Sequence, residues 1–252
     1  MINEWWIDDG LGPEAQAAFA SLEHCFQSTG DVVSASGISE VQRLQLDGKT
    51  YYLKLYFEAG ARLNKYLGKS KVRREWENLL AFKRWGLSVA KIVVRGEQST
   101  KWLQRRGVLI TEGVDDSVDL AELARQSSPL LKQPDWLFCV IEQVAQAARV
   151  MHQHRFAHND LKWRNILVSG TEDSPVVTLI DCPSGRYWSW PFWEYRRMKD
   201  LACLDTIAKH ALTKDQRVRF MRRYWQLSDG EPLSKLQQRK LKRIASFFSG
   251  KK

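Results

Sequence analysis

One stretch of eight residues constrains the fold of this chain more than any other. It reads His158-Asn159-Asp160-Leu161-Lys162-Trp163-Arg164-Asn165, and the apolar run Ile166–Val168 follows at once. Sixteen residues after Asn165, a second apolar run leads through Leu179-Ile180 to Asp181. Each polar residue alone is typical of a turn or a cap. Their order, their spacing and the flanking apolar runs together predict a loop followed by two short strands.

These residue types suit the transfer of a phosphoryl group. That reaction needs an acceptor for the proton of the attacking hydroxyl and cations on the phosphate oxygens. Asp160 can accept the proton, and Lys162 lies where it can steady the transferring phosphate. Asn165 and Asp181 offer hard oxygen ligands of the kind that Mg²⁺ prefers. We therefore predict Asp160 and Lys162 as catalytic residues, and Asn165 and Asp181 as metal ligands.

The pattern H-x-D-L-x-x-x-N resembles the protein-kinase signature, which directs attention to residues upstream. Lys54, in Tyr-Leu-Lys-Leu, resembles the strand lysine that binds nucleotide phosphates. Glu75 resembles the helix glutamate that holds such a lysine. Glu77 is the alternative, but only Glu75 lies on one helical stripe with Leu79 and Phe82. The resemblance thus implies ATP as cofactor, with Lys54 and Glu75 on the nucleotide side.

The rest of the chain predicts a β-rich lobe followed by an α-rich lobe. Two strands flank the turn residues Asp47-Gly48, and a long helical pattern precedes the eight-residue stretch. We expect one domain over 1–252, an α+β bilobal protein-kinase-like fold. The N-lobe covers about 1–111 and the C-lobe, with a basic tail, about 112–252. Glu112 falls at the junction, where the resemblance places backbone groups against adenine. The expected elements are strands 41–46, 50–57, 89–94, 107–111, 166–168 and 176–180, and helices 71–85 and 135–155.

Three stretches give a more specific resemblance. They are Arg74-Glu75-Trp76, His158-Asn159-Asp160-Leu161-Lys162 and Lys199-Asp200-Leu201-Ala202. Together they resemble the bacterial lipopolysaccharide core kinases, over roughly residues 30–248. The resemblance implies a cytoplasmic kinase, dependent on ATP and Mg²⁺, that phosphorylates heptose or Kdo sugars of the inner core and is peripheral at the inner membrane. It leaves open which sugar hydroxyl is phosphorylated.

Four departures separate the chain from ordinary protein kinases. The nucleotide loop Ser34–Ser39 has a single glycine, so we expect weaker backbone contacts to phosphate and a larger role for Lys54. Asn159 stands where an arginine would read a phosphorylated activation loop. Cys182-Pro183 follows Asp181 in place of Phe-Gly, and Pro183 restricts the backbone there. No Ala-Pro-Glu sequence follows. We expect activity that needs no activating phosphate, on an acceptor other than a peptide.

The charge is distributed unevenly. Residues 1–185 hold 22 basic and 23 acidic residues, whereas 186–252 hold 17 basic and 6 acidic ones. A one-sided basic field favours an anionic partner, although a merely solvated face gives the same composition. It argues against the cationic substrates of aminoglycoside- or choline-type kinases, which remain the alternative enzyme class. A pseudokinase would require a lost catalytic residue, and a nucleic-acid-binding module would require a motif that is absent.

Residues 187–195 contain six aromatic side chains, and many basic residues follow them. Aromatic rings pack on sugar faces and mark membrane interfaces, whereas the alternative is that they form core. We expect a platform for an anionic glycolipid acceptor at an anionic membrane surface. The sequence has no signal-peptide pattern and no apolar run of the length that spans a bilayer. Its four cysteines form no CxxC pair, which suits a reducing cytoplasm.

Overall fold

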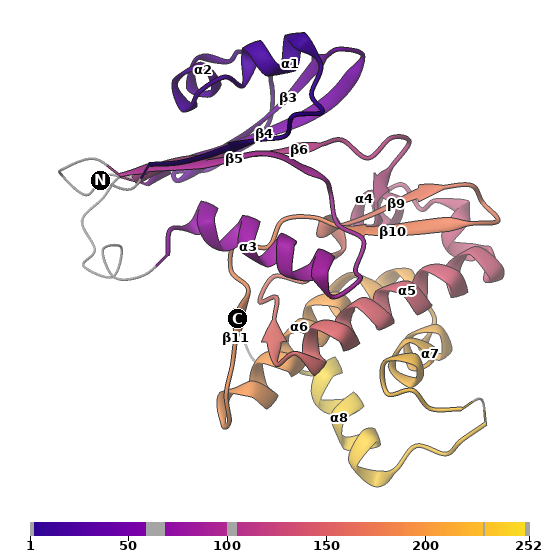
Figure 1. The fold of residues 1–252 in the computed structure, drawn as a ribbon. Coiled ribbons are helices and arrows are strands. Elements are labelled where there is room, and N and C mark those ends of the chain that lie inside the picture. Colours follow the sequence, from indigo (N-terminus) through magenta and orange to yellow (C-terminus); the bar gives the residue numbers. More distant parts are fainter. Residues whose placement is uncertain (1–2, 59–68, 100–104, 229, 250–252) are drawn as a thin grey trace. The chain divides into compact units, whose positions relative to one another are not determined.

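The computed structural model describes residues 3–58, 69–99, 105–228 and 230–249 (Figure 1). They form two compact units. The first comprises Met1–Ala81 with Val89–Asp115, and the second Phe82–Ser88 with Asp116–Lys252. Residues 82–88 belong to the second unit, although the last strands of the first unit follow them in the sequence. The reason is packing: the Phe82 ring lies edge-on against Phe156, with centroids 5.3 Å apart.

The first unit is built on an antiparallel sheet of six strands. Their spatial order is β1-β5-β6-β4-β3-β2, so the strands at one edge come from opposite ends of the unit's sequence. The predicted strands 89–94 and 107–111 appear at shifted bounds. The strands are β1 Asn3–Ile7, β2 Asp31–Ala35, β3 Ser39–Leu46, β4 Lys49–Glu58, β5 Ile92–Ser99 and β6 Arg105–Glu112.

The hairpin predicted around Asp47-Gly48 is confirmed. Leu46 pairs with Lys49, and the two turn residues have φ values of 50° and 71°. Positive φ at both positions gives a turn whose twist matches that of the strands. The Asp47 carboxylate also accepts hydrogen bonds from the N–H groups of Glu14 (3.2 Å) and Ala15 (2.9 Å) at the start of helix α1, Pro13–Ala18. The turn thereby holds a helix that the sequence did not reveal.

Helices lie on both faces of this sheet (Figure 1). On one face, α1 and α2 (Leu22–Gln27) bury Ala15, Phe19 and Cys25 against the sheet in the core of this unit. On the other face lies α3, Lys71–Arg84, which matches the predicted helix 71–85 to one residue. Its buried stripe includes Glu75 and Leu79, as the sequence predicts.

The second unit is mainly helical. Two small sheets, ordered β10-β9-β7 and β11-β8, lie among the helices. The strands are β7 Val118–Asp119, β8 Phe156–Ala157, β9 Ile166–Gly170, β10 Pro175–Leu179 and β11 Arg186–Tyr187. The helices are α4 Leu120–Arg125, α5 Pro134–Gln153, α6 Phe192–Ala211, α7 Lys214–Tyr224 and α8 Lys235–Ala245, with the 3-10 turns η2 Pro129–Lys132 and η3 Trp163–Asn165.

Helix α5 forms the centre of this unit. The residues predicted to share its inner face are all buried, namely Leu137, Ile141, Val144, Ala148 and Met151. An apolar cavity of about 330 Å³ lies among α5, α6, α7 and α8. Among the described residues, no helix combines the length and the apolar character needed to cross a bilayer.

Candidate active site

The hairpin of β9 and β10 brings two predicted metal ligands together. Ile166 is paired with Leu179, so the residue before β9 and those just after β10 lie at the same end of the hairpin. The N–H of Ile180 donates to the carbonyl of Asn165 at 3.0 Å. Asn165 and Asp181 are therefore neighbours in space, although sixteen positions separate them.

Asn165 is also joined to the loop that carries the predicted base. It is almost fully buried, and its Nδ2 donates to the backbone carbonyl of Asp160 at 2.9 Å. Because this bond occupies the amide nitrogen, the amide oxygen is the atom suited to a cation. Asp181 has a φ of 60°, a left-handed conformation that aspartate tolerates better than most residues. The structure thus gathers Asp160, Asn165 and Asp181 at one end of the hairpin.

Two cations flank the carboxylate of Asp160. Lys162 Nζ lies 2.6 Å from Oδ1, and Arg164 lies 3.5 Å from Oδ2. All three side chains are partly exposed, so a ligand can exchange with these contacts. No role was predicted for Arg164 from the sequence. The indication was there, since Arg164 follows Asp160 by four residues, a spacing at which side chains in a helical turn meet.

A buried carboxylate on a helix of the second unit fixes the backbone of the loop just before Asp160. Asp200, on α6, has no exposed surface and accepts hydrogen bonds from the N–H groups of His158 (2.7 Å) and Asn159 (2.8 Å). His152 Nε2 lies 3.4 Å from the same carboxylate, and His152 Nδ1 lies 2.8 Å from the hydroxyl of Tyr224. Asp200 lies in one of the three stretches that carry the family resemblance, but no role was predicted for it from the sequence. The structure shows that its task is to fix the backbone beside Asp160.

His158 is neutral in the folded protein. Its ring is buried on Phe82, with centroids 6.0 Å apart, and neither ring nitrogen has a hydrogen-bond partner among the described residues. Burial lowers the pKa of His158 below its ordinary value, although the carboxylates of Asp200, Asp181 and Asp160 act in the opposite direction. The ring therefore packs as an apolar group under the loop.

The nucleotide-side residues predicted in the first unit are in contact. Lys54 Nζ on β4 lies 2.9 Å from Glu75 Oε1 on α3, and both side chains are largely buried. Glu77, the alternative, instead pairs with Lys69 at 2.6 Å and Arg73 at 3.5 Å. The geometry therefore selects Glu75 as the partner of Lys54.

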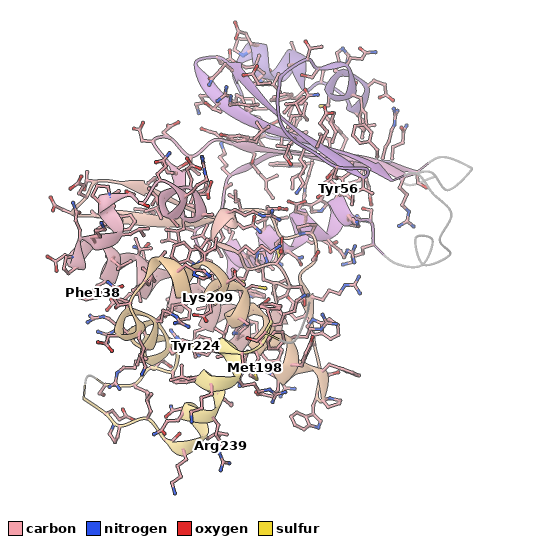
Figure 2. The ribbon with its side chains drawn as sticks, turned by 180° about the vertical axis from the view of Figure 1, so that it is seen from behind. Tyr56, Phe138, Met198, Lys209, Tyr224 and Arg239 are labelled. Atoms are coloured by element: carbon pink, nitrogen blue, oxygen red, sulfur yellow. The ribbon has the colours of Figure 1, made fainter. Side chains whose placement is uncertain are left out.

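Tyr56 joins this pair and was not assigned a role from the sequence. Its hydroxyl donates to the second oxygen of Glu75, and the Lys54 ammonium lies 5.5 Å from its ring centroid. Figure 2 shows Tyr56 between the sheet and α3. The strand alternation already put Lys54 and Tyr56 on one face. The sequence does not show that Tyr56 is buried and that its hydroxyl is bonded to Glu75. These two observations show that Tyr56 orients Glu75.

Two other predicted features of the nucleotide side have local partners. The carboxylate of Glu112 pairs with Lys49 (2.9 Å) and Lys91 (3.6 Å), and its N–H donates to the carbonyl of Lys91. These groups of Glu112 are therefore already bonded within the sheet. In the glycine-poor loop, the Ser36 hydroxyl accepts from the N–H groups of Ile38 (3.4 Å) and Ser39 (3.1 Å). These two N–H groups therefore already have a partner within the loop.

Comparison with known proteins identifies the family. A model of the lipopolysaccharide kinase (Kdo/WaaP) family matches residues 24–224. The chain belongs to this family. Lipopolysaccharide kinases of this family are ATP-dependent phosphotransferases that act on sugar hydroxyls of the lipopolysaccharide core, and the resemblance drawn from the three motifs is confirmed. The assignment favours this class over aminoglycoside- or choline-type kinases.

A solved structure confirms the fold. The structure described as WaaP in complex with acyl carrier protein matches with a TM-score of 0.73 and 21% identity. The match covers 98% of this chain and 96% of that one. The predicted protein-kinase-like fold is therefore confirmed. A comparison with curated protein sequences gave no match.

The neutral state of His158 predicts a pH-dependent stability. In the unfolded chain this histidine takes up a proton near pH 6.5, its ordinary value, whereas in the folded protein it does so only at lower pH. Below about pH 6.5 the unfolded state binds the extra proton, so the free energy of unfolding falls as the pH falls. In the wild type, His158 contributes up to about 1.4 kcal/mol per pH unit to this fall in the free energy of unfolding. We expect the His158→Leu variant to lack that contribution.

Urea unfolding at pH 7.5, 6.5 and 5.5 measures this effect for the wild type and the variant. Leu161→Met is the control, since it alters packing in the same loop without removing a titrating group. Equal slopes in wild type and His158→Leu would contradict the neutral assignment.

Proposed function

We propose that this lipopolysaccharide kinase transfers the γ-phosphoryl group of Mg²⁺-ATP to a heptose or Kdo hydroxyl of the inner core. In this proposal Asp160 accepts the proton of the attacking hydroxyl, and Lys162 steadies the transferring phosphate. Asn165 and Asp181 hold the metal, which neutralises charge on the phosphates when bound. We also propose that residues 1–252 act as one kinase domain, with the two units as its lobes.

The proximity of Asp160, Asn165 and Asp181 carries this proposal. Pairing of β9 with β10 and the bond from Asn165 to the Asp160 carbonyl bring a base and two oxygen ligands to one place. An amide oxygen and a carboxylate are hard donors, and Mg²⁺ is commonly bound by few protein ligands plus substrate phosphates. The residues present therefore fit the metal that the family implies.

Cations around the loop support an anionic acceptor. Lys162 and Arg164 contact Asp160 itself, while Arg196 and Lys199 lie within 3.4 Å of atoms of Asn159. Two of these four contacts share the single carboxylate of Asp160, and the other two are with Asn159, which is uncharged. A phosphorylated or acidic sugar would meet a favourable local field here.

On the nucleotide side, we assign Lys54 to the phosphates of ATP. Glu75 holds the ammonium group, and Tyr56 holds Glu75, so three residues determine where the Lys54 charge lies. A role for Glu112 is limited to its backbone carbonyl, because its N–H and carboxylate have partners in the sheet.

Removal of the base tests the chemistry. Asp160→Ala is expected to lower turnover roughly a hundred- to ten-thousand-fold, the usual contribution of a general base. The measurement is phosphate transfer from ATP to isolated core oligosaccharide, with melting temperature as a check on folding. Asp173→Ala, an exposed carboxylate in the turn between β9 and β10, is the control. Near-normal transfer by folded Asp160→Ala would remove Asp160 from this role.

Replacement of the ligands tests the metal. Asp181→Asn is expected to abolish Mg²⁺-dependent transfer, because a neutral amide replaces a charged ligand. Asn165→Ala should raise the Mg²⁺ requirement by a smaller factor. Transfer is measured across a Mg²⁺ titration, with Asp173→Asn as the matched control. If Asp181→Asn kept full activity at low Mg²⁺, the metal would have to be held elsewhere.

We further propose that the kinase works at an anionic membrane surface. The aromatic segment, residues 187–195, supports this, because four of its six rings are exposed rather than core. The exposed fractions are 62% for Tyr187, 74% for Trp190, 62% for Phe192 and 42% for Tyr195. Trp and Tyr rings favour the interface between water and lipid.

Helix α8 places basic residues beside this segment. Phe247, just after α8, packs on Tyr195 with centroids 5.3 Å apart, and Lys240 lies 3.6 Å from Glu194. Arg243 lies between Lys240 and Phe247 on the same helical stripe, and it is exposed. Figure 2 shows Arg239 projecting from α8 as well. Aromatic rings and cations thus share one surface of the second unit.

Other basic residues of the tail have structural partners instead. Arg222 donates to the carbonyl of Glu231 at 2.7 Å, and Arg223 lies 3.1 Å from Glu142. Arg217 forms a two-bond pair with Asp205. Reversing the charge of Arg222 or Arg223 would disturb the fold itself, so α8 is the better place to test membrane binding.

We expect sedimentation with anionic but not neutral liposomes at low salt, weakened in Arg239→Glu/Arg243→Glu. Each basic residue near an anionic surface contributes about 1 kcal/mol, so loss of two weakens binding by roughly 30-fold or more. Binding should also fall as salt rises. Lys132→Glu/Lys209→Glu is the charge-matched control, since both lysines are exposed and lie outside this surface.

Trp190→Ser/Phe192→Ser tests the aromatic part separately. Equal sedimentation with anionic and neutral liposomes, or none with either, would contradict the membrane proposal. The kinase assignment would be unaffected, because it is measured with soluble core oligosaccharide.

A further inference from the structure

Asn159, directly before Asp160, is bonded through its side chain to two other segments. Its Nδ2 donates to the carbonyl of Ser184 at 2.8 Å and lies 3.3 Å from the carbonyl of Ala157. Its Oδ1 accepts from Arg196 of α6 at 3.4 Å. One short amide therefore touches the segment that follows Asp181 and the helix that supports the loop.

The backbone of Asn159 is held as well. Its N–H donates to Asp200 at 2.8 Å, and its carbonyl accepts from Lys199 at 3.3 Å. Its φ is 63°, in the left-handed region where asparagine is several-fold enriched among residues other than glycine. Asparagine thus meets two requirements at this position: it adopts the backbone conformation, and it offers both a donor and an acceptor.

Ser184, whose carbonyl accepts the hydrogen bond from Asn159 Nδ2, belongs to the segment that follows Asp181. Ser184 lies three residues beyond Asp181. Next to it, Gly185 is packed so closely that an added Cβ would lie 2.4 Å from the Phe156 ring and 2.5 Å from Cys182 Sγ. Cys182 is itself buried, 4.0 Å from the carbonyl of His158. The segment after Asp181 is therefore closely seated, and the Asn159 amide contacts its backbone there.

We propose that Asn159 is a positioning residue that keeps the Asp181 segment in register with Asp160, so that base and metal ligand are aligned in the unmodified chain. This proposal rests on the proposed function of Asp160 and Asp181. An arginine at this position would need an added phosphate to gain its partner. The amide of Asn159 bonds a backbone carbonyl, which is present whenever the chain is folded. The alignment is therefore permanent rather than switched.

Two variants separate the amide from the backbone conformation. Asn159→Gly keeps the left-handed conformation and removes the side chain. Asn159→Asp keeps the shape, removes the donor and places a carboxylate against two carbonyl oxygens. Loss of one such hydrogen bond costs about 0.5–1.5 kcal/mol, which corresponds to roughly a two- to twelve-fold change in an equilibrium constant.

The readout is the affinity for Mn²⁺, which replaces Mg²⁺ at oxygen sites and is counted by electron paramagnetic resonance. It is titrated with a non-hydrolysable ATP analogue and no acceptor, on full-length protein shown by mass spectrometry to carry no phosphate. We expect Mn²⁺ affinity to fall about five-fold in Asn159→Gly and about ten-fold or more in Asn159→Asp. The affinity for the ATP analogue at saturating Mg²⁺ should change less than two-fold. The Asp181→Asn variant serves as the reference, because it shows how far the Mn²⁺ affinity falls when a proposed metal ligand is lost.

A fall in melting temperature with unchanged Mn²⁺ affinity in both variants would reduce Asn159 to a structural residue and overturn the proposal. The proposal would also be overturned if the wild-type protein bound Mn²⁺ only after it had been phosphorylated. If Asn159→Asp does not fold, Asn159→Gly alone decides. Because no acceptor is present, these outcomes are distinct from a failure of the lipopolysaccharide assignment, which appears as lack of transfer by wild type that binds Mn²⁺ normally.

Discussion

The hydrogen bonds from two backbone N–H groups to the buried carboxylate of Asp200 are the contact on which the rest of the site depends. A carboxylate without exposed surface is costly unless hydrogen bonds compensate it. Here the N–H groups of His158 and Asn159 do so, and these residues directly precede the predicted base. Helix α6 therefore determines where the loop lies, and the loop determines where Asp160 lies.

From that fixed loop, short contacts extend in two directions. Toward the hairpin, the Asn165 amide reaches the carbonyl of Asp160, and the pairing of β9 with β10 places Asp181 next to Asn165. Toward the chain after Asp181, the Asn159 amide reaches Ser184. His158 is buried beneath, neutral and stacked on Phe82. Polar groups of the loop thus bond the neighbouring segments, while the buried ring of His158 packs on Phe82.

The first unit also contains a buried charge that neighbouring groups compensate. Lys54 is largely buried, and its charge is balanced by Glu75, whose other oxygen is bonded by Tyr56. Removal of one member of a buried charged pair leaves an uncompensated charge, which is strongly destabilising. The ammonium group is therefore confined to one position on the sheet. That suits a group whose proposed partner is a phosphate, since a fixed charge needs little reorganisation when the ligand binds.

The sequence by itself determined the local elements and the family. The turn at Asp47-Gly48, the helix 71–85 and the apolar stripe of α5 depend on backbone preferences and periodicity, which neighbouring residues fix. The motif around Asp160 was enough to indicate the fold, and three short stretches were enough to indicate the lipopolysaccharide kinases. Only the tertiary structure decided which residues act on one another across long separations. It showed that Asp200 holds the loop, that Tyr56 holds Glu75, and that most aromatic rings of residues 187–195 are exposed. These features depend on burial and on distances between segments far apart in the chain, which no local pattern encodes.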